Sequence, residues 1–168
     1  RVNPAAATSY TDVMTVEEKL GGIADKKIAW VGDGNNMANT WITVAEKLGF
    51  ELVLACPASL PPDRGMLEAA LAHGAKVRLT TSPEEAVEGA DVVNTDTWVS
   101  MGDDDTLTRK QAFHGFQVNE ALMARAWAAG LTALRGAQAP RRDARLRVLV
   151  QNAVPTDMVS EAGPGAQQ

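Results

Sequence analysis

The stretch Lys27-Ile-Ala-Trp-Val-Gly-Asp-Gly-Asn-Asn36 decides the fold. Its first five residues are mostly apolar, and Gly32 and Gly34 then mark a tight turn, which is typical of a buried strand that feeds a turn. The apolar residues that follow are spaced as one stripe of a helix that stops at Gly49; they are Met37, Trp41, Val44, Ala45 and Leu48. The sequence therefore predicts a strand, a turn and a helix.

The same unit recurs along the chain. Further strands are expected at 51–56, 76–80 and 91–95, and helices are expected to begin near Pro61 and Ser82. Alternating short strands and helices favour a parallel sheet covered on both faces, built from right-handed βαβ units. We therefore expect an α/β protein with a doubly wound, Rossmann-like parallel sheet, three αβα layers and the strand order 3-2-1-4-5.

Less regular segments flank this core. Helices are expected at 12–20 and 119–129, and a fifth strand at 131–134, whereas 146–150 is the only later segment that resembles a strand. The residues expected to face inward in the helices after positions 61 and 119 are Met66, Leu67, Ala70, Leu71, Leu122, Met123, Ala126 and Trp127.

Bulk properties exclude several classes of function. The 168 residues, of which 45% are hydrophobic, are enough for one globular domain. No apolar run reaches the ~18 residues of a membrane span, and no secretion signal is present, so we expect a cytoplasmic protein without a membrane partner. One cysteine and two histidines are too few for a disulfide or a zinc centre. The net charge of −5 argues against a nucleic-acid partner.

Charge is unevenly distributed along the chain. Residues 135–168 carry five arginines but only three acidic side chains, whereas the rest of the chain is net acidic. We therefore divide the chain at residue 134 into a domain, 1–134, and an atypical C-terminal tail, 135–168, which is either disordered or aberrant.

Two loops are the expected ligand site. In an open parallel sheet, ligands bind beyond the carboxyl ends of the strands where the strand order reverses. The expected order places the loops 32–36 and 96–102 at that point. Asp96 directly follows a strand there, where its carboxylate could pair with a ligand ammonium or simply cap the next turn.

Gly32 and Gly34 also raise a dinucleotide interpretation, because they match the first half of a Gly-x-Gly-x-x-Gly fingerprint. Met37 replaces the third glycine, and no acidic residue ends the second strand to hold a ribose hydroxyl. Asn35 and Asn36 instead suit a ligand carboxylate or amino group at a helix start. We therefore expect no nicotinamide cofactor.

Read together, the two loops resemble the paired signatures of ornithine carbamoyltransferases, in the stretches WVGDGNNMANTW at 30–41 and TDTWVSMG at 95–102. LACP at 54–57, EGADVVNTDTW at 88–98 and FQVNEAL at 116–122 are similar to the same family in order and spacing. The resemblance runs from about Asp12 to Leu134. It implies the second domain of the family, which has the doubly wound sheet expected above.

The resemblance implies transfer of a carbamoyl group from carbamoyl phosphate to the side-chain amine of L-ornithine, which gives citrulline and phosphate. It assigns Asn36 to the α-carboxylate end of ornithine and Asp96 to its α-ammonium group. Ser100 and Met101 would complete the pocket. A carboxylate facing an ammonium, and neutral amides facing a carboxylate, are the complements that a zwitterion requires.

The sequence also departs from the family. The Ser-Thr-Arg-Thr-Arg motif of the preceding carbamoyl phosphate domain is absent. Asn3-Pro-Ala-Ala-Ala stands where His-Pro-x-Gln is expected, and Leu134-Arg-Gly-Ala-Gln stands where His-Cys-Leu-Pro is expected. We therefore assign no catalytic residue, and expect binding of carbamoyl phosphate only with an N-terminal domain and no turnover by the isolated chain.

Two other functions remain open: a non-catalytic amino-acid-binding module, and a related carbamoyltransferase with another amine acceptor. The oligomeric state is also open. Cys56 is expected to be a small buried apolar group, and Trp30, Trp41 and Trp127 to be core residues. His73 and His114 are expected to be solvated, and Trp98 could serve either role.

Overall fold

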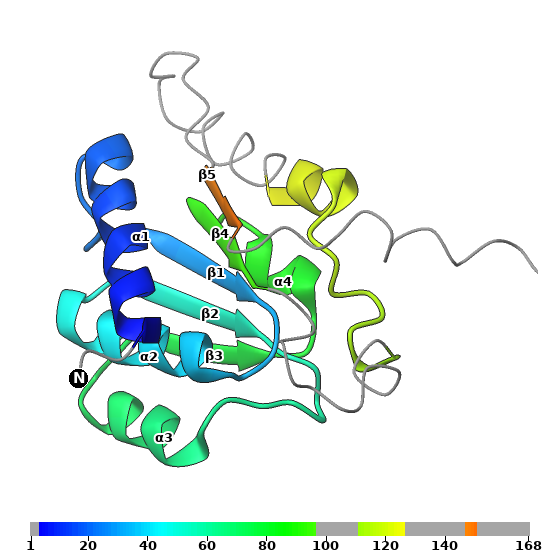
Figure 1. Cartoon of the computed structure of the whole chain (residues 1–168), viewed down its shortest axis with the longest axis horizontal. Helices are drawn as coiled ribbons and strands as arrows, with labels where there is room; N and C mark the ends of the chain where they lie inside the picture. The colour runs from blue at the N-terminus through cyan, green and yellow to red at the C-terminus, as the bar shows by residue number, and fades with distance from the viewer. Residues whose placement is uncertain (1–3, 97–110, 127–146, 151–168) are drawn as a thin grey trace, which may run out of the picture.

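The computed structural model describes residues 4–96, 111–126 and 147–150 (Figure 1). These residues form a five-stranded sheet in the order β3-β2-β1-β4-β5, with every neighbouring pair parallel. The strands are β1 (Lys27–Val31), β2 (Glu51–Ala55), β3 (Val77–Thr80), β4 (Val92–Thr95) and β5 (Arg147–Val150). The labelled helices are α1 (Pro4–Leu20), α2 (Asn36–Leu48), α3 (Arg64–Ala72) and α4 (Pro83–Val87), and residues 120–126 are also helical.

The first strand and helix form as their sequence predicts. Ile28 to Val31 are fully buried, as a central strand of a parallel sheet requires. Helix α2 begins at the N-cap Asn35 and ends at Gly49, whose φ of 77° is the left-handed conformation that glycine adopts at helix ends. Its Trp41 is fully buried and packs edge-on against Phe50, with ring centroids 5.9 Å apart.

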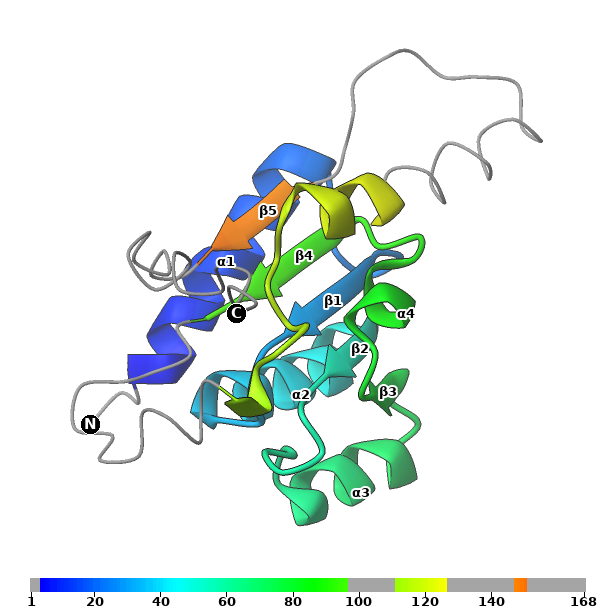
Figure 2. The ribbon, with the colours of Figure 1, turned by 90° about the vertical axis from the view of Figure 1, so that its right-hand side faces the viewer.

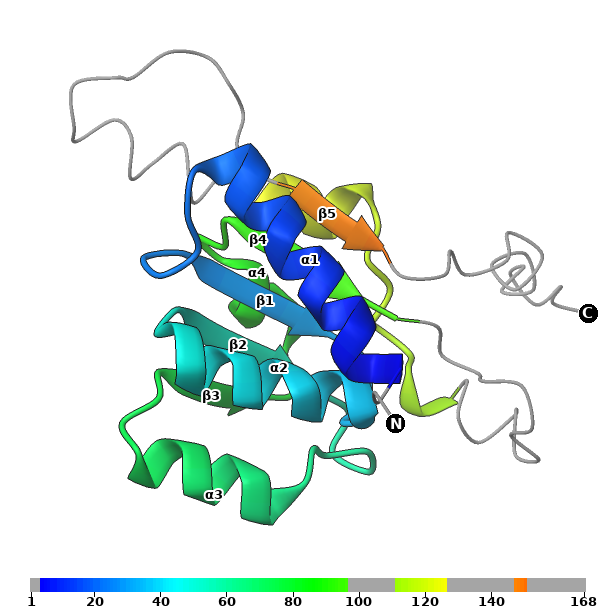
Figure 3. The same cartoon turned by 60° about the vertical axis from the view of Figure 1, so that its left-hand side comes forward.

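Helices cover both faces of the sheet (Figures 2 and 3). On one face, α1, α2 and Ala70 of α3 pack on strand residues such as Ile28 and Leu52. On the other face, α4 and the helical residues 120–126 pack on alternate strand residues such as Ala29 and Val53. This alternation confirms the doubly wound, three-layer α/β fold and the order 3-2-1-4-5.

Several details differ from the sequence predictions. Helix α1 starts at Pro4 instead of near position 12, because a proline at the first helical turn and three alanines favour the helix. The expected strand 131–134 and Trp127 lie outside the described residues, whereas Arg147–Val150 pairs with β4 as the fifth strand. This fifth strand lies within residues 135–168, which the charge pattern separates from the domain as a tail. Part of that tail therefore joins the sheet.

Helix α3 packs less closely than predicted. Ala70 is buried, but Met66 is 39% and Leu71 48% exposed, so the prediction that both face inward was wrong. The physical reason is position: α3 follows β2 and lies beside β3, the edge strand, so fewer elements surround it. Leu79 of β3 is likewise 42% exposed.

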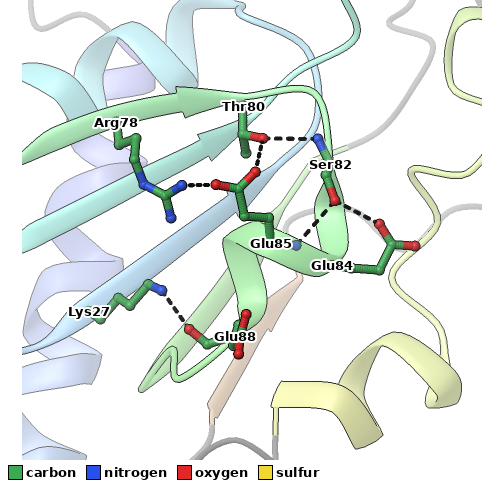
Figure 4. A network of polar contacts seen from close by, with 7 residues as sticks. All are labelled: Lys27, Arg78, Thr80, Ser82, Glu84, Glu85 and Glu88. Atoms are coloured by element: carbon green, nitrogen blue, oxygen red, sulfur yellow. Dashed lines mark hydrogen bonds and ion pairs between the residues drawn. The ribbon is translucent and has the colours of Figure 1, made fainter.

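A polar network fastens α4 to the edge of the sheet (Figure 4). Glu85 is bound by the guanidinium of Arg78 and the hydroxyl of Thr80, both from β3. Ser82 caps α4 by accepting a hydrogen bond from the Glu85 amide, and Lys27 of β1 donates to the Glu88 carbonyl.

None of the helices in these described ranges is long and apolar enough to cross a membrane.

Candidate functional site

The strand order reverses between β1 and β4, which are parallel neighbours: β2, which follows β1 in the chain, lies on one side of this pair, and β5, which follows β4, lies on the other. Val31 is paired with Thr95 at the carboxyl ends of these strands, so the loops that begin at Gly32 and Asp96 start next to each other. The Thr95 hydroxyl strengthens this junction by donating a 2.7 Å hydrogen bond to the Val31 carbonyl. This is the position at which open α/β sheets bind ligands.

Asn35 joins the two loops through both ends of its side-chain amide. Its Oδ1 accepts hydrogen bonds from the backbone N–H groups of Met37 (2.8 Å) and Ala38 (3.2 Å), which caps α2. Its Nδ2 donates to Oδ2 of Asp96, 3.2 Å away and 61 positions along the chain. One side chain therefore connects the start of α2 with the end of β4.

Two of the predicted site residues lie at this edge of the sheet. Asp96 follows β4 directly and is partly exposed, and its Oδ2 lies 3.2 Å from Nδ2 of the α2 cap Asn35. Asn36 is the first residue of α2 and its side chain is exposed. Asn35, which precedes Asn36 in the chain, contacts Asp96. Ser100 and Met101, the other two predicted residues, lie outside the described residues, as does Trp98.

Gly34 is required by a close approach of two protein segments. A Cβ at this position would lie 2.0 Å from the backbone nitrogen of Pro62, which is far inside contact distance. The Gly34 amide donates to the Leu60 carbonyl at 2.8 Å, and Asn39 bridges the same segments by accepting from the Asp63 amide at 2.9 Å. The second glycine of the Gly-x-Gly turn is thus explained by packing against protein backbone.

The interior beside the first loop holds Cys56 and Asp33. Burial, with a further contribution from the Asp33 carboxylate, raises the pKa of the Cys56 thiol to about 12. Trp30 donates from its indole nitrogen to the Asp33 carbonyl at 3.0 Å, which holds the loop against the core. Cys56 is therefore buried, as predicted, in surroundings that disfavour its thiolate form.

A buried polar contact below α1 was not predicted. Asn94 of β4 donates a 3.2 Å hydrogen bond from Nδ2 to Oδ2 of Asp12, and both residues are buried. Ser9, one helical turn earlier on α1, is fully buried too. The sequence signal was the helical spacing of Ser9 and Asp12 with the buried Val13 and Val16, which places these polar residues on the apolar face.

The two histidines are both exposed. His73, at the end of α3, has a side chain that is 64% exposed and pairs with Glu46 at 3.1 Å, and His114 is exposed, as predicted for both. Within the described ranges, no three His, Cys, Asp or Glu side chains come together as a metal site.

The sheet order, with polar loops at the carboxyl ends of β1 and β4 (the polar edge), defines a doubly wound α/β domain. Residues 24–130 match the family model of the aspartate/ornithine carbamoyltransferase Asp/Orn binding domain, and the chain belongs to that family. The match contains both loops of the polar edge, and it ends close to the division at residue 134.

Individual relatives agree with this family. The chain is 54% identical over 118 residues to an ornithine carbamoyltransferase of Desulfotalea psychrophila, in a match that covers 69% of this chain and 39% of that protein. It is 55% identical over 113 residues to that of Pelobacter propionicus, covering 66% and 37%. The chain thus spans about two fifths of the length of these curated relatives.

Solved structures show the same fold. The ornithine carbamoyltransferase of Pyrococcus furiosus superposes with a TM-score of 0.65 at 37% identity, over 73% of this chain and 40% of that one. The anabolic enzyme of Campylobacter jejuni superposes with a TM-score of 0.66 at 30% identity, over 91% and 47%.

Proposed function

We propose that this chain is the L-ornithine-binding domain of an ornithine carbamoyltransferase, a transferase of arginine biosynthesis. The observation that carries the proposal is the pairing of Asp96 with the N-cap of α2 at the point where the strand order reverses. The same residues lie in the two stretches that resemble the family signatures, and the relatives named above are ornithine carbamoyltransferases.

The charges at the site complement an amino acid zwitterion. The Asp96 carboxylate binds the α-ammonium group of ornithine, because opposite charges at a partly buried site form strong hydrogen bonds. Asn36, exposed at the first turn of α2, donates from its amide to the α-carboxylate, which the positive end of the helix dipole also favours. Ser100 and Met101 complete the pocket in this proposal.

The proposed reaction joins this site to carbamoyl phosphate held by a preceding domain. The side-chain amine nitrogen of ornithine attacks the carbamoyl carbon, the bond from that carbon to the phosphate oxygen breaks, and the amine loses a proton. Citrulline and phosphate are the products. The role of this chain is to fix the amino acid so that its amine faces the carbamoyl group, which lowers the entropic cost of the encounter.

The isolated chain is proposed to bind ornithine without turning it over. If it is instead a non-catalytic amino-acid-binding module, it also binds ornithine, but it forms no citrulline when a carbamoyl phosphate domain from a relative is added. Citrulline formation in that mixture is the outcome expected here. The cytoplasmic location expected from the sequence stays a prediction.

Chemical-shift mapping on the full ¹⁵N-labelled chain tests where ornithine binds. L-Ornithine is expected to shift the backbone amides of Gly32 to Asn36 and of Asp96, and to leave those of Glu51 and Lys76, at the opposite end of the sheet, in place. Putrescine, which lacks the α-carboxylate, should bind more weakly. Shifts confined to the opposite end, or equal binding of both amines, would contradict the proposed site.

A further inference from the structure

We propose that Asn35 is a positioning residue that orients the Asp96 carboxylate toward the ligand, beyond its visible role as a helix cap. The inference rests on the proposed function in one respect, namely that Asp96 binds an ammonium group. Its structural part, the coupling of the α2 cap to Asp96, stands on the contacts of Asn35 alone.

The cap determines which way the amide of Asn35 faces. Two backbone N–H groups, those of Met37 and Ala38, point at one atom of the side chain, so that atom must be the oxygen. The amide nitrogen is then directed away from the helix, to Asp96 at 3.2 Å. Rotating the amide by 180° would break all three hydrogen bonds at once, so the donor is held in one orientation.

A fixed donor restricts the carboxylate of Asp96. This residue follows the end of β4, and rotation about its Cβ–Cγ bond decides where its two carboxylate oxygens point. The hydrogen bond from Asn35 Nδ2 holds one of them, Oδ2, at 3.2 Å. A carboxylate already oriented loses less freedom when an ammonium group binds, so affinity rises without any contact between Asn35 and the ligand.

A neutral donor is suited to this task. Lysine or arginine in place of Asn35 would orient Asp96 as well, but its positive charge would compete with the ligand ammonium for the carboxylate. The amide of Asn35 leaves the negative charge of Asp96 in place. The structure also offers a matched cap without this second contact: Asp63 caps α3 by accepting from the Met66 amide at 2.8 Å.

The test compares Asn35→Ser with Asn35→Ala in the full chain, and Asp63→Ser with Asp63→Ala as controls. Serine keeps a cap at either site, and alanine removes it. We expect both Asn35 variants to lose roughly tenfold in ornithine affinity, because neither keeps the amide Nδ2 that reaches the charged Asp96 while the cap is made. Only the alanine variants should melt lower, by roughly 3 °C. Both Asp63 variants should keep the wild-type affinity.

A second measurement needs no ornithine. In ¹⁵N spectra, the side-chain NH₂ resonances of Asn35 should move in the Asp96→Ala variant, while the capped amides of Met37 and Ala38 stay in place. Unmoved NH₂ resonances, or wild-type ornithine affinity in Asn35→Ser, would overturn the inference. If wild-type protein binds no ornithine but the NH₂ resonances move, the proposed function fails and the coupling of Asn35 to Asp96 remains.

Discussion

Asn94 of β4 and Asp12 of α1 lie 82 positions apart in the sequence, yet their buried side chains meet in a 3.2 Å hydrogen bond. This contact fixes α1 over β4, the strand that ends at Thr95 directly before Asp96. A carboxylate on the buried face of a helix is costly unless a partner satisfies it, and Asn94 supplies a donor. The first helix is therefore tied to the strand that carries the candidate site.

Replacing Asn94 with alanine tests this contact. The change leaves the Asp12 carboxylate without the Asn94 donor in a buried position, so we expect the free energy of unfolding to fall by about 2–4 kcal/mol. Urea denaturation followed by circular dichroism measures the effect. Asp25→Ala, at an exposed position, is the control and should change stability by less than about 0.5 kcal/mol. Equal stability of the two variants would show that the buried contact contributes nothing.

Replacing Gly34 with alanine should disrupt the loop that leaves β1. The added Cβ would lie 2.0 Å from the Pro62 backbone nitrogen, so the segment 60–62 must move or the loop must rearrange. We expect a loss of roughly 3 kcal/mol or more, or failure to fold. Gly65→Ala, where the nearest atom to the new Cβ is Asp63 Oδ1 at 3.3 Å, is the matched control. If both variants denature at the wild-type urea concentration, the close approach at Gly34 is wrong.

The buried thiol gives a prediction about reactivity. Because burial raises the pKa of Cys56 to about 12, almost no thiolate is present near pH 8 in the folded chain. Labelling with a thiol-specific disulfide reagent should be slow in native buffer and rapid in denaturing urea, where the pKa returns to its ordinary value. Absorbance of the released chromophore measures both rates. Rapid labelling of the native chain would contradict the buried position of Cys56.

The network in Figure 4 predicts a pH dependence at the edge of the sheet. Hydrogen bonds from Thr80 and then Arg78 lower the pKa of Glu85 in the folded chain. Because this pKa is lower in the folded than in the unfolded chain, ionised Glu85 stabilises the fold at pH values above its unfolded pKa. That stabilisation is lost as the pH falls through the folded pKa of Glu85. Glu85→Gln removes it, so the variant should lose less stability than wild type between neutral pH and acid. Parallel acid denaturation curves of the two proteins would argue against this contribution.

The layers of the fold were predictable because the apolar pattern of each segment favours the same strand or helix that the sheet requires there. Apolar runs such as Lys27–Val31 can be recognised without any partner, and alternation of strands with helices leaves few topologies. Where packing depends on position in the sheet, the prediction failed: Met66 and Leu71 have helical spacing for a buried face, but α3 lies beside an edge strand that covers little of it.

The candidate site was predictable in place but not in its internal contacts. The loops after β1 and β4 follow from the strand order, so Asn36 and Asp96 could be assigned to one edge. The hydrogen bond of Asn35 to Asp96 joins residues 61 positions apart, and no local pattern encodes it. The helical spacing of Asp12 with Val13 and Val16 indicates its buried face, but its partner Asn94 lies 82 positions away and no local pattern encodes that contact.

Calorimetric titration of the full chain with L-ornithine tests the central claim most directly. We expect one binding site per chain, and roughly 10- to 100-fold weaker binding for Asp96→Asn, which removes the charge that faces the ammonium group. Glu51→Gln, an exposed carboxylate at the opposite end of the sheet, should bind as wild type does. Absence of ornithine binding, or equal affinity of wild type and Asp96→Asn, would contradict the account.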